Sequence, residues 1–103
     1  MTLLEKATDT LLLGNDIMKE WVQVKLEDGN KIIIDIPKDK NKIQIIKIWI
    51  TYAFHDLSSV KKFYRSNTKD KNLYKAFIDV YENLIQLVLL AIEEVEGKDD
   101  ADI

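Results

Sequence analysis

The densest group of residues that could do chemistry is a basic segment with aromatic residues in it. Six Lys and Arg side chains lie within residues 61–75, with one acidic residue among them. Lysine and arginine neutralise phosphate groups, and an exposed tyrosine can stack on a base. The segment therefore predicts a contact with DNA or RNA. The candidate nucleic-acid-binding residues are Lys61, Lys62, Arg65, Lys69, Lys71 and Lys75.

The same segment has a simpler interpretation. Lys61, Lys62 and Arg65 fall where a helix is expected to end, and the helix dipole stabilises cations at a helix C-terminus. The neighbouring aromatic residues would then belong to the core. No sequence pattern typical of RNA-recognition, helix-turn-helix, KH or zinc-finger domains accompanies the cations. The two interpretations differ in whether the segment binds a polyanion.

Residue patterns typical of an enzyme are not found. His55 is the single histidine, and it does not face its neighbour Asp56, because adjacent residues of a helix point in different directions. The absence of cysteine excludes disulfides, thiolate zinc sites and cysteine nucleophiles. Phosphate-binding loops and hydrolase motifs are also absent. We therefore expect a non-enzymatic protein with no catalytic residue, no metal site and no cofactor.

Charge is sorted along the chain, although the net charge is only −3. Residues 1–37 carry −3, residues 38–75 carry +7 and residues 76–103 carry −7. Fields of one sign attract partners of the opposite sign. The C-terminal acids lie where a helix dipole disfavours negative charge. They could contact a basic partner, mimic nucleic acid or fold back on the basic corner, or they could form a solubilising tail.

Length and composition predict one domain. The chain has 103 residues, of which 47% are hydrophobic and 32% charged, so it can bury a core and is unlike a disordered chain. Its apolar runs are far shorter than the ~20 residues that cross a bilayer, and the N-terminus lacks the basic stretch of a signal peptide. We expect a single compact domain at residues 1–97, a short acidic flexible tail at residues 98–103, and a cytoplasmic protein without membrane contact.

The elements that must position these residues begin with a helix. Thr2 and Glu5 form a T-x-x-E capping box before a periodic apolar stretch. Gly14 and Asn15 predict a break or kink in this helix before Met18.

A β-hairpin is predicted next, from the alternating apolar residues of 22–26 and 32–36. The even-numbered residues share one face only if the connecting loop has three residues, because a two-residue loop would mix the faces. We therefore predict that Val24 pairs with Ile32 and that Gly29 takes the left-handed conformation.

Two long helices are predicted to follow. Polar residues recur at intervals of three and four through residues 42–64, which favours a helix over a third strand. A last helix is predicted at residues 71–96, capped by Thr68 or Asp70 and ended by Gly97. Both helices carry apolar residues on two faces. On the first, the second apolar face consists of Ile45, Ile48, Trp49 and Tyr52.

The predicted order is α-β-β-α-α, an α+β domain with the N-terminal helix and the β-hairpin packed on two long C-terminal helices. Two double-faced helices carry more apolar surface than the other elements can cover, and a hairpin leaves its edges open to pairing. We therefore expect assembly with further copies of the chain or within a larger protein complex. The candidate interface residues are Trp21, Ile33, Trp49, Tyr52, Tyr81 and Ile85.

These patterns together predict a non-catalytic accessory protein. It would assemble through apolar helix faces and contact nucleic acid through the basic corner between the two long helices. The alternative is a pure protein–protein adaptor or a homo-oligomeric structural protein with no nucleic-acid contact.

Overall fold

The structure is a computed structural model that describes residues 2–13 and 15–101. It confirms the predicted α+β class, with helices and one two-stranded antiparallel hairpin in the order α-α-β-β-α-α-α. The elements are α1 (Leu3–Leu12), α2 (Asp16–Trp21), β1 (Gln23–Glu27), β2 (Lys31–Asp35), α3 (Lys40–His55), α4 (Leu57–Asn67) and α5 (Lys71–Ala101).

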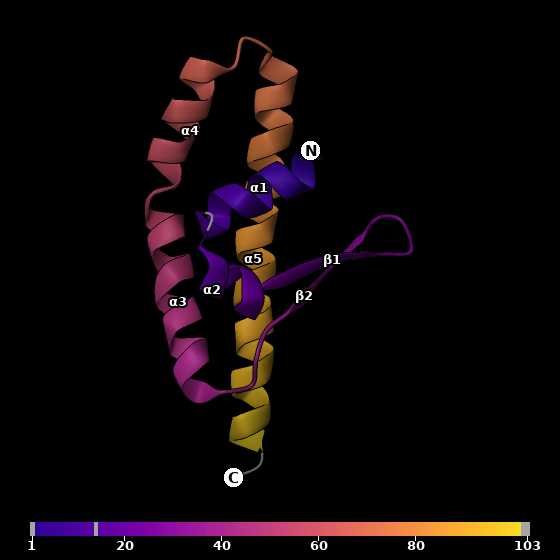
Figure 1. Ribbon diagram of the computed structural model, residues 1–103, viewed down its shortest axis with the longest axis vertical. Helices are drawn as coiled ribbons and strands as arrows, with labels where there is room; N and C mark the ends of the chain where they lie inside the picture. Colours follow the sequence, from indigo (N-terminus) through magenta and orange to yellow (C-terminus); the bar gives the residue numbers. More distant parts are fainter. Residues whose placement is uncertain (1, 14, 102–103) are drawn as a thin grey trace.

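The long helix α5 is the axis of the fold. Helices α3 and α4 follow one another along one side of it, α1 crosses it, and the hairpin projects away from the helices (Figure 1). α5 contacts α1, α3, α4 and β2. The molecule is elongated, with extents of 52 × 31 × 23 Å. The central helix is therefore α5.

The predicted start of the first helix and the break after it are both confirmed. The Thr2 hydroxyl oxygen accepts a hydrogen bond from the Glu5 backbone N–H at 3.1 Å. α1 ends at Leu12, and Leu13 takes a left-handed conformation with φ 50°. The side chain of Asn15 then caps α2, as expected for asparagine at a helix start.

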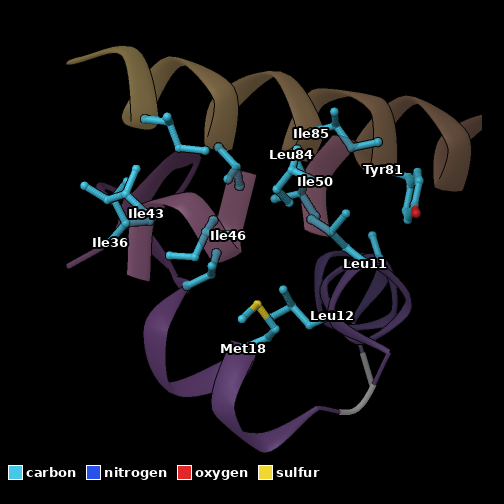
Figure 2. Close-up of a cluster of buried hydrophobic side chains, with 14 of the residues drawn as sticks. Leu11, Leu12, Met18, Ile36, Ile43, Ile46, Ile50, Tyr81, Leu84 and Ile85 are labelled. Atoms are coloured by element: carbon cyan, nitrogen blue, oxygen red, sulfur yellow. The ribbon is translucent and has the colours of Figure 1, made fainter. Parts of the chain in front are cut away.

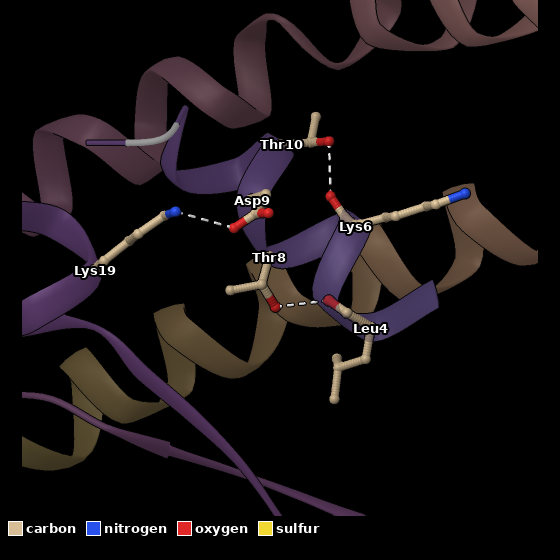
Figure 3. Close-up of polar contacts among 6 residues, drawn as sticks. All are labelled: Leu4, Lys6, Thr8, Asp9, Thr10 and Lys19. Carbon is tan, nitrogen blue, oxygen red and sulfur yellow. Dashed lines mark hydrogen bonds and ion pairs between the residues drawn. The ribbon is translucent and has the colours of Figure 1, made fainter. Parts of the chain in front are cut away.

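Polar contacts hold α1 and the short helix α2 together. The Lys19 ammonium lies 3.2 Å from the Asp9 carboxylate and joins the two helices. Within α1, the hydroxyls of Thr8 and Thr10 donate to backbone carbonyls four residues earlier (Figure 3). Both threonines thereby satisfy their hydroxyls inside the helix.

The hairpin has the predicted loop length and the predicted pairing of even with even residues, but its register is shifted. Val24 pairs with Ile34, so the expected partner Ile32 was wrong by two residues. The three-residue loop is centred on Gly29, one residue later than expected. Asp28 and Gly29 both have positive φ, at 50° and 85°. Aspartate tolerates this region, which allows the turn to begin there.

Only the base of the hairpin belongs to the core. Val22 and Ile36 are buried, and Ile34 packs partly against them. Leu26, near the tip, is exposed, since the tip reaches beyond the helices (Figure 1).

The predicted helix over residues 42–64 is divided in two. α3 ends at His55 and α4 begins at Leu57, with Asp56 between them at φ −87° and ψ 4°. Backbone hydrogen bonding continues across the junction, since the Asp56 N–H donates to Tyr52 at 2.9 Å and the Asp56 carbonyl accepts from Val60 at 3.1 Å. The backbone therefore departs from helical angles at Asp56 alone, and backbone hydrogen bonds still connect α3 to α4.

The last helix starts as predicted and ends later. Asp70 is the cap, because its carboxylate accepts hydrogen bonds from the N–H groups of Asn72 at 2.9 Å and Leu73 at 3.3 Å. Gly97 does not end the helix, which continues to Ala101. Glycine inside a helix costs about 1 kcal/mol, which a helix can tolerate. Residues 102–103 of the predicted tail lie outside the described residues.

The core lies where α5 meets α1 and α3, and Met18 of α2 belongs to the same buried cluster. Figure 2 shows Tyr81, Leu84 and Ile85 of α5 beside Ile50 of α3 and Leu11 of α1. The buried core residues are Ala7, Leu11, Leu12, Met18, Val22, Ile36, Ile43, Ile46, Ile50, Phe77, Ile78, Tyr81, Leu84, Ile85, Val88 and Ile92.

Candidate functional site

The face of α3 that points away from the core is apolar. Ile45, Ile48 and Tyr52 are 47%, 56% and 72% exposed, and their spacing of three and four residues places them in one line along the helix. We call these three residues the α3 stripe. The buried face of the same helix consists of Ile43, Ile46 and Ile50. At 100° per residue the two sets lie on opposite sides, so the stripe takes no part in the core.

A cavity of about 480 Å³ adjoins one end of the stripe, at the junction of α1, α3 and α4. Leu13 at its rim is 75% exposed. The indole N–H of Trp49 donates to the Leu11 carbonyl at 2.8 Å and fixes the ring against α1. We call this the junction cavity. Its lining consists of Thr10, Leu11, Leu13, Trp49, Tyr52, Ala53, His55, Asp56, Val60 and Tyr81.

The polar side of the junction cavity suits hydrogen bonding. It contains His55, Asp56 and Tyr81. Burial raises the pKa of the Tyr81 hydroxyl, and the negative charge of Asp56 raises it further. The hydroxyl therefore stays protonated at neutral pH and can donate a hydrogen bond. No local sequence pattern indicates this grouping, because Asp56 and Tyr81 are far apart along the chain.

The predicted interface residues fall into different environments. Tyr52 is exposed, whereas Trp21, Ile33 and Trp49 are half-buried. The Lys42 ammonium lies 5.4 Å from the centroid of the Trp21 ring, which is within cation–π range.

Two of the predicted interface residues are not on the surface. Tyr81 and Ile85 are only 2% and 1% exposed, because they fill the space between α5 and the helices around it (Figure 2). They are core residues and offer no surface to a partner. Exposed apolar residues lie near both of them, since Tyr52 lines the junction cavity with Tyr81 and Phe54 lines another cavity with Ile85.

The basic corner gathers four of its six predicted residues around one cavity. This cavity has a volume of about 370 Å³ and lies where α4 passes into α5. We call it the corner cavity. Its lining consists of Arg65, Thr68, Lys69, Lys71, Tyr74 and Lys75.

The other two predicted basic residues lie outside the corner cavity. The Lys61 ammonium is 2.9 Å from the Glu82 carboxylate, and the hydrogen bond to Glu82 raises the pKa of Lys61. Lys62 is exposed and does not line the cavity. One aromatic residue of the segment also belongs to the core, since Tyr64 stacks on Phe77 with centroids 4.0 Å apart and planes at 4°.

The C-terminal acids are partly engaged with α3. Glu96 accepts a hydrogen bond from the Lys47 ammonium at 3.4 Å, and both side chains are partly exposed. An exposed pair of this kind contributes little to stability, about 0–1 kcal/mol.

Among the side chains that the structure describes, no three of His, Asp or Glu gather closely enough to hold a metal ion. No helix in the described ranges is long and apolar enough to span a bilayer. Comparison of the chain with protein-family models, curated proteins and solved structures gave no match.

Proposed function

We propose that this chain is a non-catalytic accessory protein of the cytoplasm that assembles with a second copy of itself through the α3 stripe. The observation that carries the proposal is the position of the stripe. Three large apolar side chains, each about half exposed or more, stand in one line on the side of α3 opposite the core. Single exposed apolar residues are ordinary, whereas an aligned set is typical of an interaction surface.

A second copy suits the stripe because the stripe is nearly symmetric. Ile45 and Tyr52 lie at equal distances along the helix from a point between Ile48 and Trp49. A two-fold contact between antiparallel α3 helices therefore places Ile45 of one copy opposite Tyr52 of the other. The same contact brings Ile45 to the mouth of the other copy's junction cavity, which Tyr52 borders.

A stable dimer interface would have to include residues around the α3 stripe as well as the stripe itself. A stable interface buries about 800 Å² on each partner, which three side chains alone do not supply. Leu13 is largely exposed and lines the junction cavity with Tyr52. The interface would therefore extend from the stripe across the cavity to the end of α1.

The test is sedimentation equilibrium over a range of protein concentrations. The wild type is expected to form dimers, and Ile48→Ser is expected to weaken dimer formation about tenfold or more, since burying an isoleucine is worth about 1.5–3 kcal/mol. The matched control is Leu90→Ser on α5, where Leu90 is 57% exposed and lies off the stripe. A wild type that stays monomeric, or equal loss of association in both variants, would refute the proposal.

The function has two forms, which differ in their contact with nucleic acid. In the simpler form the chain is a pure protein–protein adaptor or a homo-oligomeric structural protein. In the wider form the assembly also contacts DNA or RNA through the basic corner. The gathering of Arg65, Lys69, Lys71 and Lys75 around one cavity favours the wider form.

A further inference from the structure

Most of the positive charges of the corner cavity lie where they destabilise the start of α5. Lys71 opens α5, and Lys69 and Lys75 lie within a turn or so of this N-terminus. The positive end of the helix dipole disfavours cations there. Lys71 and Lys75 are also four residues apart on one helix, a spacing at which like charges repel. Only Arg65, near the end of α4, has the placement that a helix dipole favours.

Acidic side chains compensate these cations only in part, since Asp70 lies between Lys69 and Lys71 and Asp79 lies one turn after Lys75. In the ranges that the structure describes, none of the four takes part in an ion pair. The nearest carboxylate along the chain is that of Asp70, which already accepts the N–H groups of Asn72 and Leu73. A bound anion would offset the repulsion that the protein leaves uncompensated.

The contents of the corner cavity fit a phosphate group and a base. The guanidinium of Arg65 presents paired N–H donors to phosphate oxygens, and the lysines add point charges. Tyr74 is half-buried and lines the cavity between the cations, where its ring can stack on a base. The volume of about 370 Å³ is within the roughly 300–1,000 Å³ of small-ligand sites.

Acidic residues limit how far a polyanion can extend from this cavity. Along α5, Lys75 is followed one turn later by Asp79, and Glu82 is paired with Lys61. Asp79 and Glu82 both line a neighbouring cavity of about 400 Å³. A strand that ran down the groove between α4 and α5 would bring its phosphates against these carboxylates. The groove therefore accepts phosphate at the corner and repels it farther along.

We infer that the corner cavity binds single-stranded nucleic acid, holding one or two phosphates with Arg65, Lys69, Lys71 and Lys75 and stacking one base on Tyr74. The strand crosses the corner and does not follow the α4–α5 groove. This inference rests on the wider form of the proposed function and names its ligand.

The test measures binding of a fluorescently labelled single-stranded oligothymidylate of about 12 nucleotides, a length within the range of single-strand sites. Affinity is measured by anisotropy between about 50 and 200 mM salt, where log affinity falls by about 0.7 per contacted phosphate for each unit of log salt. A slope of about −0.7 to −1.4 is expected. A slope several times steeper would contradict contact with one or two phosphates.

Two double variants distinguish binding at the corner cavity from general electrostatic attraction to the protein. Arg65→Gln/Lys71→Gln removes two charges from the cavity, and Lys38→Gln/Lys62→Gln removes two exposed charges outside it. The first is expected to lose about tenfold or more in affinity, the range of one hydrogen bond to a charged group. The second is expected to change affinity by less than about twofold. Equal losses would overturn the cavity as the site while leaving the nucleic-acid contact in place.

Further arms identify the ligand. Tyr74→Leu is expected to weaken binding of the oligonucleotide and to leave binding of inorganic phosphate unchanged. If Tyr74→Leu bound the oligonucleotide as tightly as the wild type, the stacking role of Tyr74 would be overturned. Inorganic phosphate or thymidine monophosphate that binds as tightly as the oligonucleotide would overturn the single-strand assignment, as would equal binding of a duplex. Absence of any nucleic-acid binding would refute the wider form itself. Dimer formation, measured separately on the same samples, reports on the α3 stripe.

Discussion

Helices α3 and α5 both carry two rows of apolar residues, but the two rows lie side by side on α5 and on opposite sides of α3. On α5, Phe77, Tyr81, Leu84 and Ile85 are all buried, because α1, α3 and α4 pack around that helix. On α3, Ile48 on the second face is exposed, since nothing in the described chain packs there. The difference shows that a second row of apolar residues is buried where it adjoins the first row and exposed where it lies on the opposite side of the helix.

This comparison assigns separate roles to the two faces of α3. The face containing Ile46 should determine stability, and the face containing Ile48 should determine association.

The largest expected effect is on the buried face. Ile46→Ala should lower the free energy of unfolding by about 2–5 kcal/mol, because it leaves a cavity in a fully buried site. Ile48→Ala should change the stability of the dilute protein by no more than about 0.5 kcal/mol, as at other exposed sites. Urea unfolding of both variants at low concentration provides the comparison. A cost at Ile48 similar to that at Ile46 would break the separation.

A smaller effect is expected at Trp49, which lies between the two faces. Trp49→Phe keeps an aromatic ring and removes the indole N–H that donates to the Leu11 carbonyl at 2.8 Å. The loss should be about 0.5–1.5 kcal/mol, the usual net contribution of a hydrogen bond, and urea unfolding measures it. No loss would show that water replaces the bond and that Trp49 does not hold α1 against α3.

The smallest effect is a dependence of stability on pH that arises from Tyr81 of α5. The folded pKa of Tyr81 is raised above 10.0 by burial and by Asp56. The folded state therefore binds its proton more tightly than the unfolded state. The resulting stability is complete below about pH 10 and is lost as pH rises through the folded pKa.

Removing the Tyr81 hydroxyl should therefore flatten the alkaline limb of the stability profile. The ordinary pKa of tyrosine is 10.0. As pH rises from neutral to values above this pKa, the free energy of unfolding should fall less in Tyr81→Phe than in the wild type. Urea midpoints measured across this pH range give the comparison, and an unchanged alkaline limb in Tyr81→Phe would contradict the assignment.

Local sequence signals predicted most of the elements. The capping box at Thr2, the cap at Asp70 and the break at Asn15 each depend on a side chain and its own neighbours along the chain. The apolar second face of α3 was also predicted from its spacing. Such signals are local, so they can be recognised in the sequence without knowing the packing.

What the sequence could not determine depends on packing. Tyr81 and Ile85 have the same pattern on α5 that Ile48 and Tyr52 have on α3, and only the position of α1 and α3 shows which set is covered. The hairpin register depends on where the turn begins. The turn begins at Asp28, whose backbone has a positive φ.

The basic segment shows the same limit. Spacing grouped six cations, and the structure separated Lys61, which pairs with Glu82, from those that share the corner cavity. Glu82 lies on a different helix from Lys61, so no local sequence pattern indicates this pair.

The central claim, that the exposed face of α3 joins two copies, is tested most directly by the melting temperature as a function of protein concentration. Association that requires the folded state makes the melting temperature rise with concentration. We expect this rise in the wild type and in Leu90→Ser. In Ile48→Ser the rise should begin only at a concentration about tenfold or more higher, and at high dilution the melting temperature should approach that of the dilute wild type. A wild-type melting temperature that does not change with concentration would contradict the claim.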